Sequence, residues 1–191
     1  GKSKITNLLE GQDVINTLKV MRILGAKIFK KNKEYVVYGV PPGMLFQPTK
    51  TLDFGNSGTG VRLLMGLIAS NKITARITGD RSLSKRPMKR VTTHLEKTGA
   101  LIKMKKQSYL PITIQGVGDA IPLKYNITIP SAQIKSAIML SALNTKGTVE
   151  IKEFKTTRDH TENILKFLGF NIKIEKQLKI KQTNIHKGFN V

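Results

Sequence analysis

The sequence predicts an α/β lobe built from three related units of helix, strand, helix, strand and strand, with helices packed inside and sheets outside. A turn that repeats along the chain is the first observation. At Gly25, Gly99 and Gly169, which are 74 and 70 residues apart, a helical pattern ends in Gly and passes directly into a strand. A Gly there suits the left-handed position that follows a helix, where a Cβ would cost energy. Motifs at a nearly constant spacing indicate an internal repeat.

The segments before these turns carry apolar residues at helical spacing, and each has a start signal. We expect Asp13 and Asp159 to be N-caps and Pro87 to occupy a first helical position. The helical spacing is clearest at Val14, Leu18 and Met21, and again at Val91 and Leu95.

Alternating β-type runs surround these helices. Strands are predicted before them at residues 3–7, 74–78 and 148–152, and after the Gly turns at residues 35–38, 110–115, 124–129 and 178–181. The whole chain is therefore expected to be a single lobe, with repeats at roughly residues 1–50, 51–125 and 126–191.

Two further helices rich in small residues are expected, one beginning near residues 56–62 and the other near residues 130–136. Ser57 and Ser131 are 74 residues apart, and each precedes the next predicted strand by the same interval. Applied to the first unit, that interval puts the matching Ser about fifteen residues before Gly1. We therefore expect the first unit to be short and to lack its counterpart of these two helices.

The two helix starts are suited to binding anions. Backbone N–H groups at a helix start are free and carry partial positive charge, so the segments 57–59 and 131–133 are candidate phosphate or carboxylate sites. Gly58 permits a close backbone approach, and Ser131 and Gln133 add side-chain donors. Plain N-capping is the alternative for each Ser taken singly. Their equivalent positions in repeated units favour ligand binding.

Arginine side chains precede two of the other helices. Arg86 lies directly before Pro87, and Arg158 lies directly before Asp159. A guanidinium group can bind a carboxylate or a phosphate through two parallel hydrogen bonds. The alternative is a solvated basic turn in a chain rich in Lys.

The net charge of +21 is compatible with a nucleic-acid partner, but the composition does not favour one. Of the 33 basic residues, 26 are Lys, and they are scattered along the chain rather than gathered in a stripe. Aromatic residues make up 6% and Trp is absent, so base-stacking side chains are few. We expect a basic surface with a few specific anion sites and no nucleic-acid partner.

The sequence contains few residues suited to metal binding, nucleophilic catalysis or proton transfer. The sequence has no Cys, and its three His residues share no spacing typical of metal ligands, so neither a metal nor another cofactor is expected. His160 is interpreted as a capping partner at a helix start. The few acidic residues form no recognisable acid–base pair, so no catalytic residue is predicted. The chain has no signal peptide and no apolar run of the roughly 20 residues that a membrane span needs, so a cytoplasmic protein is expected.

Four long motifs follow one another along the chain: LDFGNSGTGVRLL at 52–64, GDRSLSKRPM at 79–88, SAQIKSA at 131–137 and TRDHTE at 157–162. Together with the opening ITNLLEG at 5–11, these motifs, in this order, resemble the 5-enolpyruvylshikimate-3-phosphate synthase family. The resemblance covers essentially the whole chain. It implies the first lobe of the enolpyruvyl transferase fold, whose complete form has two lobes of three repeats each.

The resemblance also implies an activity and a set of binding residues. Enzymes of the family transfer the carboxyvinyl group of phosphoenolpyruvate to shikimate 3-phosphate and release phosphate, a step of aromatic amino-acid biosynthesis. By the family pattern, shikimate 3-phosphate would contact Ser131, the Ala132 backbone, Gln133 and Arg158. Phosphoenolpyruvate would contact Gly58, Arg86 and Gln133.

The chain also departs from the family pattern. The family's Gly-Asp-Lys-Ser motif would precede Gly1, and the second lobe with its proton-transfer carboxylates would follow Val191. The expectation is therefore a fragment that is inactive alone and monomeric, and that a missing second lobe would complete. The related transferase that acts on a UDP-amino sugar fits less well, because it usually carries a reactive Cys. The remaining alternatives are a non-catalytic basic domain that binds nucleic acid and a degenerate remnant.

Overall fold

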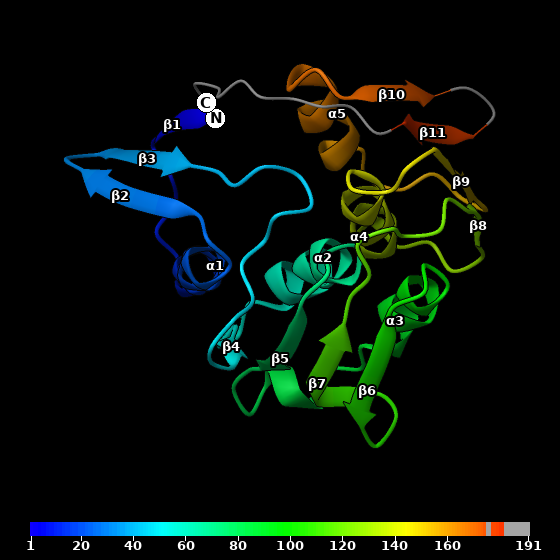
Figure 1. Cartoon of the computed structure of the whole chain (residues 1–191), viewed down its shortest axis with the longest axis horizontal. Coiled ribbons are helices and arrows are strands. Elements are labelled where there is room, and N and C mark those ends of the chain that lie inside the picture. The colour runs from blue at the N-terminus through cyan, green and yellow to red at the C-terminus, as the bar shows by residue number, and fades with distance from the viewer. Residues whose placement is uncertain (175–176, 182–191) are drawn as a thin grey trace.

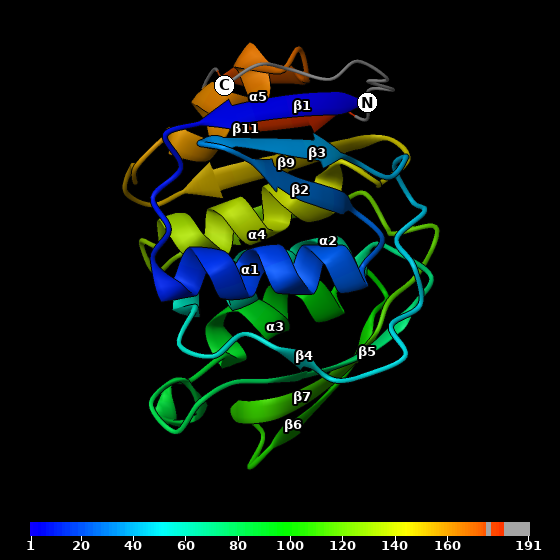
Figure 2. The ribbon, with the colours of Figure 1, turned by 90° about the vertical axis from the view of Figure 1, so that its left-hand side faces the viewer.

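The computed structural model describes residues 1–174 and 177–181 of the chain. Two helices, α2 (Gly58–Ala69) and α4 (Ala132–Ala142), lie side by side in the middle of the molecule, and three sheets surround the helices (Figures 1 and 2). The expected class is confirmed: the chain is an α/β lobe with helices inside and sheets outside.

The first sheet is a three-stranded antiparallel sheet with β3 in the centre. Its strands are β1 (Lys2–Thr6), β3 (Glu34–Tyr38) and β2 (Lys27–Lys31), and α1 (Gln12–Ile23) connects β1 to β2. The register pairs Ile5 of β1 with Tyr35 of β3.

The other two sheets have four strands each and share one pattern, in which a parallel pair is extended by antiparallel strands. The second sheet has the order β4 (Leu52–Asp53), β5 (Thr74–Thr78), β7 (Tyr109–Gln115) and β6 (Leu101–Lys105). The third has the order β10 (Asn171–Ile174), β11 (Leu178–Lys181), β9 (Thr148–Glu153) and β8 (Lys124–Ile127). The remaining helices are η1 (Leu83–Lys85), α3 (Lys89–Glu96) and α5 (His160–Phe167).

The expected order of elements within a unit was wrong, because it lacked the parallel strands β4 and β8. Each precedes a central helix and pairs with the strand that follows that helix, β4 with β5 and β8 with β9. We expected residues 124–129 to form a strand after the second Gly turn, at the division between the second and third units, whereas β8 pairs within the third sheet. The proposed unit had no strand before its first helix. The division near residues 50 and 125 stays a prediction.

The Gly turns have the predicted backbone conformation. Gly25, Gly99 and Gly169 have φ angles of 109°, 100° and 82°, in the region that a side chain disfavours. Each therefore ends a helix and turns the chain directly into a strand.

The predicted helix starts were less accurate. Helix α1 begins at Gln12, because the Gly11 carbonyl oxygen accepts the first helical bond, from Ile15, at 3.0 Å; Asp13 lies inside the first turn. Pro87 is not a first helical position, since Met88 is the N-cap of α3 and its amide donates to the Ser108 carbonyl oxygen at 2.7 Å. Asp159 is the N-cap of α5 by position, but its side chain makes no capping bond.

One main core joins the second and third sheets through α2 and α4. It contains fully buried residues such as Phe54, Met65, Ile77 and Met139. The first sheet has a separate, smaller cluster of Ala26, Ile28 and Tyr35. Most of the apolar burial therefore lies outside the first sheet.

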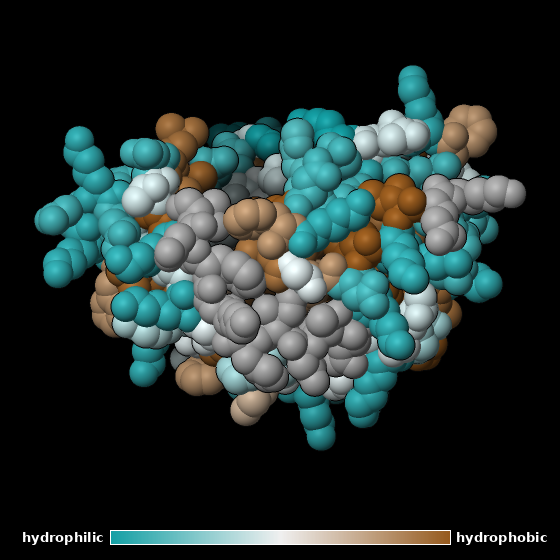
Figure 3. Space-filling model, turned by 90° about the horizontal axis from the view of Figure 1, so that it is seen from above, coloured by the Kyte–Doolittle hydropathy of each residue, from teal (hydrophilic) through white to brown (hydrophobic). Residues whose placement is uncertain are grey.

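An apolar groove of about 340 Å³ opens beside this smaller cluster, between the first sheet and the C-terminal ends of α2 and α4. Leu67, Leu143 and Phe170 line it opposite Val37. From above, Figure 3 shows hydrophobic side chains near the middle of a face that is otherwise largely hydrophilic. Among the described residues, no helix is long and apolar enough to cross a membrane.

His94 of α3 makes the stability of the fold pH-dependent. Its ring lies 6.1 Å from that of Tyr125, and its Nδ1 atom is buried with no hydrogen-bond partner among the described residues. Burial, aided by the charge of Lys97, lowers the pKa of His94 below its usual 6.5. The unfolded chain therefore binds the proton first, and the stability that His94 confers is present above about pH 6.5 and lost as the pH falls towards the folded pKa.

We expect the free energy of unfolding to decrease between about pH 7 and pH 5 more steeply in the parent chain than in His94→Phe. Urea denaturation at a series of pH values measures both slopes. The ring of Phe keeps the contact with Tyr125 and removes the titration. Equal slopes in the two proteins would show that His94 does not contribute to the pH dependence.

Candidate functional site

At the N-terminus of α2, no side chain among the described residues offsets the partial positive charge of the helix. Ser57 is buried, and its hydroxyl pairs with the Thr17 hydroxyl of α1 at 3.0 Å rather than capping the helix. The first turn of α2 contains no acidic residue. Free backbone N–H groups at such an end attract an anion.

The start of α4 is similar but is capped by its serine. The Ser131 hydroxyl accepts a hydrogen bond from the Ile134 amide at 3.4 Å, and the first turn again has no acidic residue. The capping alternative therefore describes the Ser131 side chain and does not describe the Ser57 side chain. Ala132 and Gln133 follow in the first turn of α4, and both are half-buried.

A side-chain hydrogen bond joins the two helix starts. The Gln133 amide donates from Nε2 to the Thr59 hydroxyl oxygen at 3.0 Å, across a sequence separation of 74 residues. The close approach of the helices makes this bond possible, since Gly66 of α2 packs directly against the Ala137 backbone of α4. The two candidate anion sites are thus neighbours in one surface region.

The Arg86 guanidinium lies against the start of α2. It donates from Nη2 to the Asn56 side-chain oxygen at 2.8 Å. A Cβ on Gly58 would lie 2.8 Å from Arg86 Nη1, so the absence of a side chain at position 58 leaves room for the guanidinium. Gly58 and Arg86, predicted as one subsite, are adjacent.

Arg62 adds to the positive charge at this end of α2. It donates to the carbonyl oxygens of Gly58 at 3.2 Å and of Pro87 at 3.4 Å. Burial, together with the charges of Arg86 and Arg90, lowers the pKa of Arg62. Within the part of the chain that the structure describes, none of these three arginines forms an ion pair with a carboxylate. A bound anion would relieve the mutual repulsion.

The other predicted group surrounds the start of α4. A surface hollow of about 590 Å³ is lined by Ser131, Ala132, Gln133 and Arg158 together with Thr157 and other neighbours. An adjoining hollow of about 240 Å³ is lined by Thr59, His160 and, again, Gln133 and Arg158. None of the residues that line the two hollows is acidic. All four residues that the family resemblance grouped around one anion thus line the same hollow.

The arrangement supplies donors and positive charge, which suits binding rather than proton transfer. His160 is the one ordinary acid–base side chain lining either hollow. Among the described residues, no group of three His, Cys, Asp or Glu side chains could hold a metal ion.

The sequence profile of EPSP synthase (3-phosphoshikimate 1-carboxyvinyltransferase) matches residues 1–191, the full length of the chain. The chain belongs to the EPSP synthase family. Relatives named 3-phosphoshikimate 1-carboxyvinyltransferase include those of Zymomonas mobilis and Parvibaculum lavamentivorans. They are each 46% identical to the chain, over 97% and 92% of its length. The chain spans only 41% and 39% of those two proteins.

Solved structures agree with this assignment to the EPSP synthase family. EPSP synthase from Acinetobacter baumannii superposes on the whole chain with a TM-score of 0.93 at 36% identity, and the chain covers 44% of it. An enolpyruvyl transferase from Streptomyces tendae gives a TM-score of 0.70 at 15% identity, which shows a shared fold.

The structure adds partners and positions that the sequence did not predict for some residues of this region. Thr59 lies in the predicted anion segment 57–59, but its hydrogen bond to Gln133 was not predicted, although their separation of 74 residues equals the spacing of the two segments. His160 was interpreted as a capping partner, but its side chain lines the smaller hollow. Asn56 gave no signal, because only the folded chain brings it to Arg86, 30 residues away.

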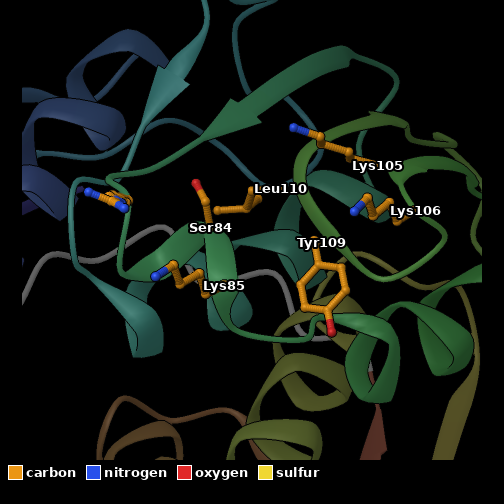
Figure 4. Close-up of a pocket in the computed structure, with 7 residues that line it drawn as sticks. Ser84, Lys85, Lys105, Lys106, Tyr109 and Leu110 are labelled. Atoms are coloured by element: carbon orange, nitrogen blue, oxygen red, sulfur yellow. The ribbon is translucent and has the colours of Figure 1, made fainter.

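Another basic hollow, of about 480 Å³, contains none of the predicted site residues. It lies between the η1 segment and the β6–β7 hairpin, and it is lined by Arg81, Ser84, Lys85, Lys105, Lys106, Tyr109 and Leu110. In Figure 4 the amino groups of Lys105 and Lys106 extend from the hairpin towards the side of Ser84, and the Tyr109 hydroxyl points away. Its cations are exposed surface side chains. It is therefore a basic surface feature separate from the joined helix starts.

Proposed function

We propose that this chain is the substrate-binding lobe of an enolpyruvyl transferase of the shikimate pathway. In that reaction a hydroxyl oxygen of shikimate 3-phosphate forms a bond to C2 of phosphoenolpyruvate. The bond from C2 to the phosphate oxygen breaks, the hydroxyl proton is released, and phosphate leaves. Both substrates are anions. The observation that carries the proposal is the pair of helix starts joined by Gln133 and Thr59, with Arg86 on one side and Arg158 on the other.

Each substrate is assigned to one part of this region. Shikimate 3-phosphate would bind at the start of α4, where Ser131, the Ala132 backbone, Gln133 and Arg158 line one hollow. Phosphoenolpyruvate would bind at the start of α2, against Gly58 and Arg86 and within reach of Gln133. Gln133 would thus contact both substrates.

The lobe orients the substrates, and a second lobe would supply the groups that move protons. The hollows contain no carboxylate for that purpose. We therefore propose that the 191-residue chain is inactive alone, monomeric, and cytoplasmic. The family match favours this function over a nucleic-acid-binding domain or a degenerate remnant.

Substitution of Gln133 or Arg158 tests the proposal. In calorimetric titrations with shikimate 3-phosphate we expect Gln133→Ala and Arg158→Ala each to weaken binding roughly tenfold or more, since a hydrogen bond to a charged group contributes about 1.5–3 kcal/mol. Lys152→Ala removes an exposed charge on β9 and is the matched control. Unchanged affinity in both site variants would refute the assignment. Phosphate release by the chain alone, dependent on both substrates, would refute its inactivity.

A further inference from the structure

Lys135 is the largest charged side chain in the interior of the described structure. It lies in α4, two residues after Gln133, and is 1% exposed. A buried ammonium group is costly unless it is paired and hydrogen-bonded.

The ammonium group of Lys135 has three N–H bonds, and three oxygens surround it. Glu162 Oε1 lies at 2.5 Å, Glu153 Oε2 at 2.9 Å and the Thr157 carbonyl oxygen at 3.4 Å. Burial alone would lower the pKa of Lys135, but the hydrogen bonds to Glu162 and Glu153 outweigh burial and raise it. The group is therefore charged at neutral pH and fully hydrogen-bonded.

These three partners belong to one loop and its two ends. Glu153 is the last residue of β9, Glu162 lies in the first turn of α5, and Thr157 is in the loop between them. The Thr157 hydroxyl also donates to Glu153 Oε1 at 2.5 Å. A single side chain of α4 therefore fixes both ends and the middle of the segment that carries Arg158.

We propose that Lys135 is a positioning residue of the anion site: by holding Thr157, Glu153 and Glu162, it places Arg158 opposite the Ala132–Gln133 helix start. The inference rests on the function proposed above. Arg158 is exposed and makes no hydrogen bond or ion pair of its own among the described residues, so its location depends on the backbone of Thr157. Ser136 and Thr161, whose hydroxyls pair at 2.7 Å, link α4 to α5 independently of Lys135.

If the role of Lys135 were purely structural, its loss would affect the stability of the fold and not ligand affinity specifically, so the test needs a variant that keeps the fold stable. Neutral or apolar side chains that replace a buried ionic cluster as a set often leave stability unchanged or raise it, whereas removal of one charge alone is strongly destabilising. The informative variant is therefore the triple substitution Lys135→Met, Glu153→Gln and Glu162→Gln, which leaves no unpaired buried charge. The single substitution Lys135→Met would leave the buried Glu162 carboxylate and the partly buried Glu153 carboxylate without their cation, and it is the less useful variant.

The experiment is a double-mutant cycle read by titration with shikimate 3-phosphate. We expect the triple variant to melt as cooperatively as the parent and to bind about tenfold more weakly. In the Arg158→Ala background the same three substitutions should have little further effect, because the residue through which they act is already absent. Unchanged binding by the triple variant, or the same fold loss in both backgrounds, would overturn the proposal.

Amide hydrogen exchange separates this inference from the proposed function. In the triple variant, exchange should accelerate at the Phe154 and Asn163 amides, which are hydrogen-bonded at the two ends of the segment, and stay unchanged at the Val61 amide in α2. If Arg158→Ala does not affect ligand affinity, the substrate assignment fails, but accelerated exchange at Phe154 and Asn163 would still show that Lys135 positions the segment. Unchanged exchange at both amides would refute the positioning role itself.

Discussion

Gly66→Ala is expected to lower the free energy of unfolding by about 2 kcal/mol or more. A Cβ at this position would overlap the Ala137 carbonyl oxygen and lie 2.9 Å from the carbonyl carbon. Replacing a helical Gly with Ala normally stabilises a helix by about 1 kcal/mol. Here the steric overlap outweighs that gain, because the atoms in contact belong to the backbone of another helix and cannot rotate away. Urea denaturation measures the change.

Gly39→Ala is the matched control, since a Cβ at Gly39 would meet no atom within 4 Å. Its free energy of unfolding should remain within about 0.5 kcal/mol of the parent. If Gly66→Ala proved as stable as Gly39→Ala, the tight packing of α2 on α4 would be contradicted. The larger Val at position 66 should prevent cooperative folding altogether.

Arg86→Met is expected to weaken the binding of phosphoenolpyruvate roughly tenfold to a hundredfold while leaving the fold intact. The guanidinium lies at the surface against Gly58 and is oriented by Asn56, so its loss removes a donor without opening the core. Titration calorimetry at about 0.15 M salt measures the affinity, because salt screens the long-range effect of net charge.

Arg81→Met is the matched control, because it changes the net charge by the same amount as Arg86→Met. Arg81 lies in the same loop as Arg86, but its side chain lines the separate basic hollow. The Arg81→Met variant should bind phosphoenolpyruvate as the parent does. Equal weakening in the Arg81 and Arg86 variants would show that only the overall positive charge of the loop matters.

The fold could be predicted from the sequence wherever local chemistry determines the conformation. Gly25, Gly99 and Gly169 were predictable because few other residues tolerate their φ angles. The residues around the two proposed ligand positions could be named from the sequence because they lie in long motifs that resemble the family. The proximity of the α2 and α4 starts could be predicted only in part, since the Gln133–Thr59 hydrogen bond depends on how the two helices cross.

Features set by non-local contacts could not be predicted in the same way. Strand β4 has two residues and is defined by its pairing with β5. The start of α3 shifted past Pro87 because Met88 bonds to Ser108, twenty residues later. Lys135 looked like one Lys among 26, since its carboxylate partners lie 18 and 27 residues further along the chain.

The hydrogen bond between Gln133 and Thr59 implies communication between the two proposed ligand positions. The Gln133 side-chain amide has two N–H bonds, so it can donate to a ligand at the start of α4 while it also donates to the Thr59 hydroxyl. A ligand that fixes the Gln133 side chain would therefore also fix Thr59 beside the start of α2. Thermodynamic linkage requires that an effect of one ligand on the affinity of the other be matched by an equal effect in return. A single side-chain amide that bridges α2 and α4 would thus couple the two proposed ligand positions with no movement of the backbone.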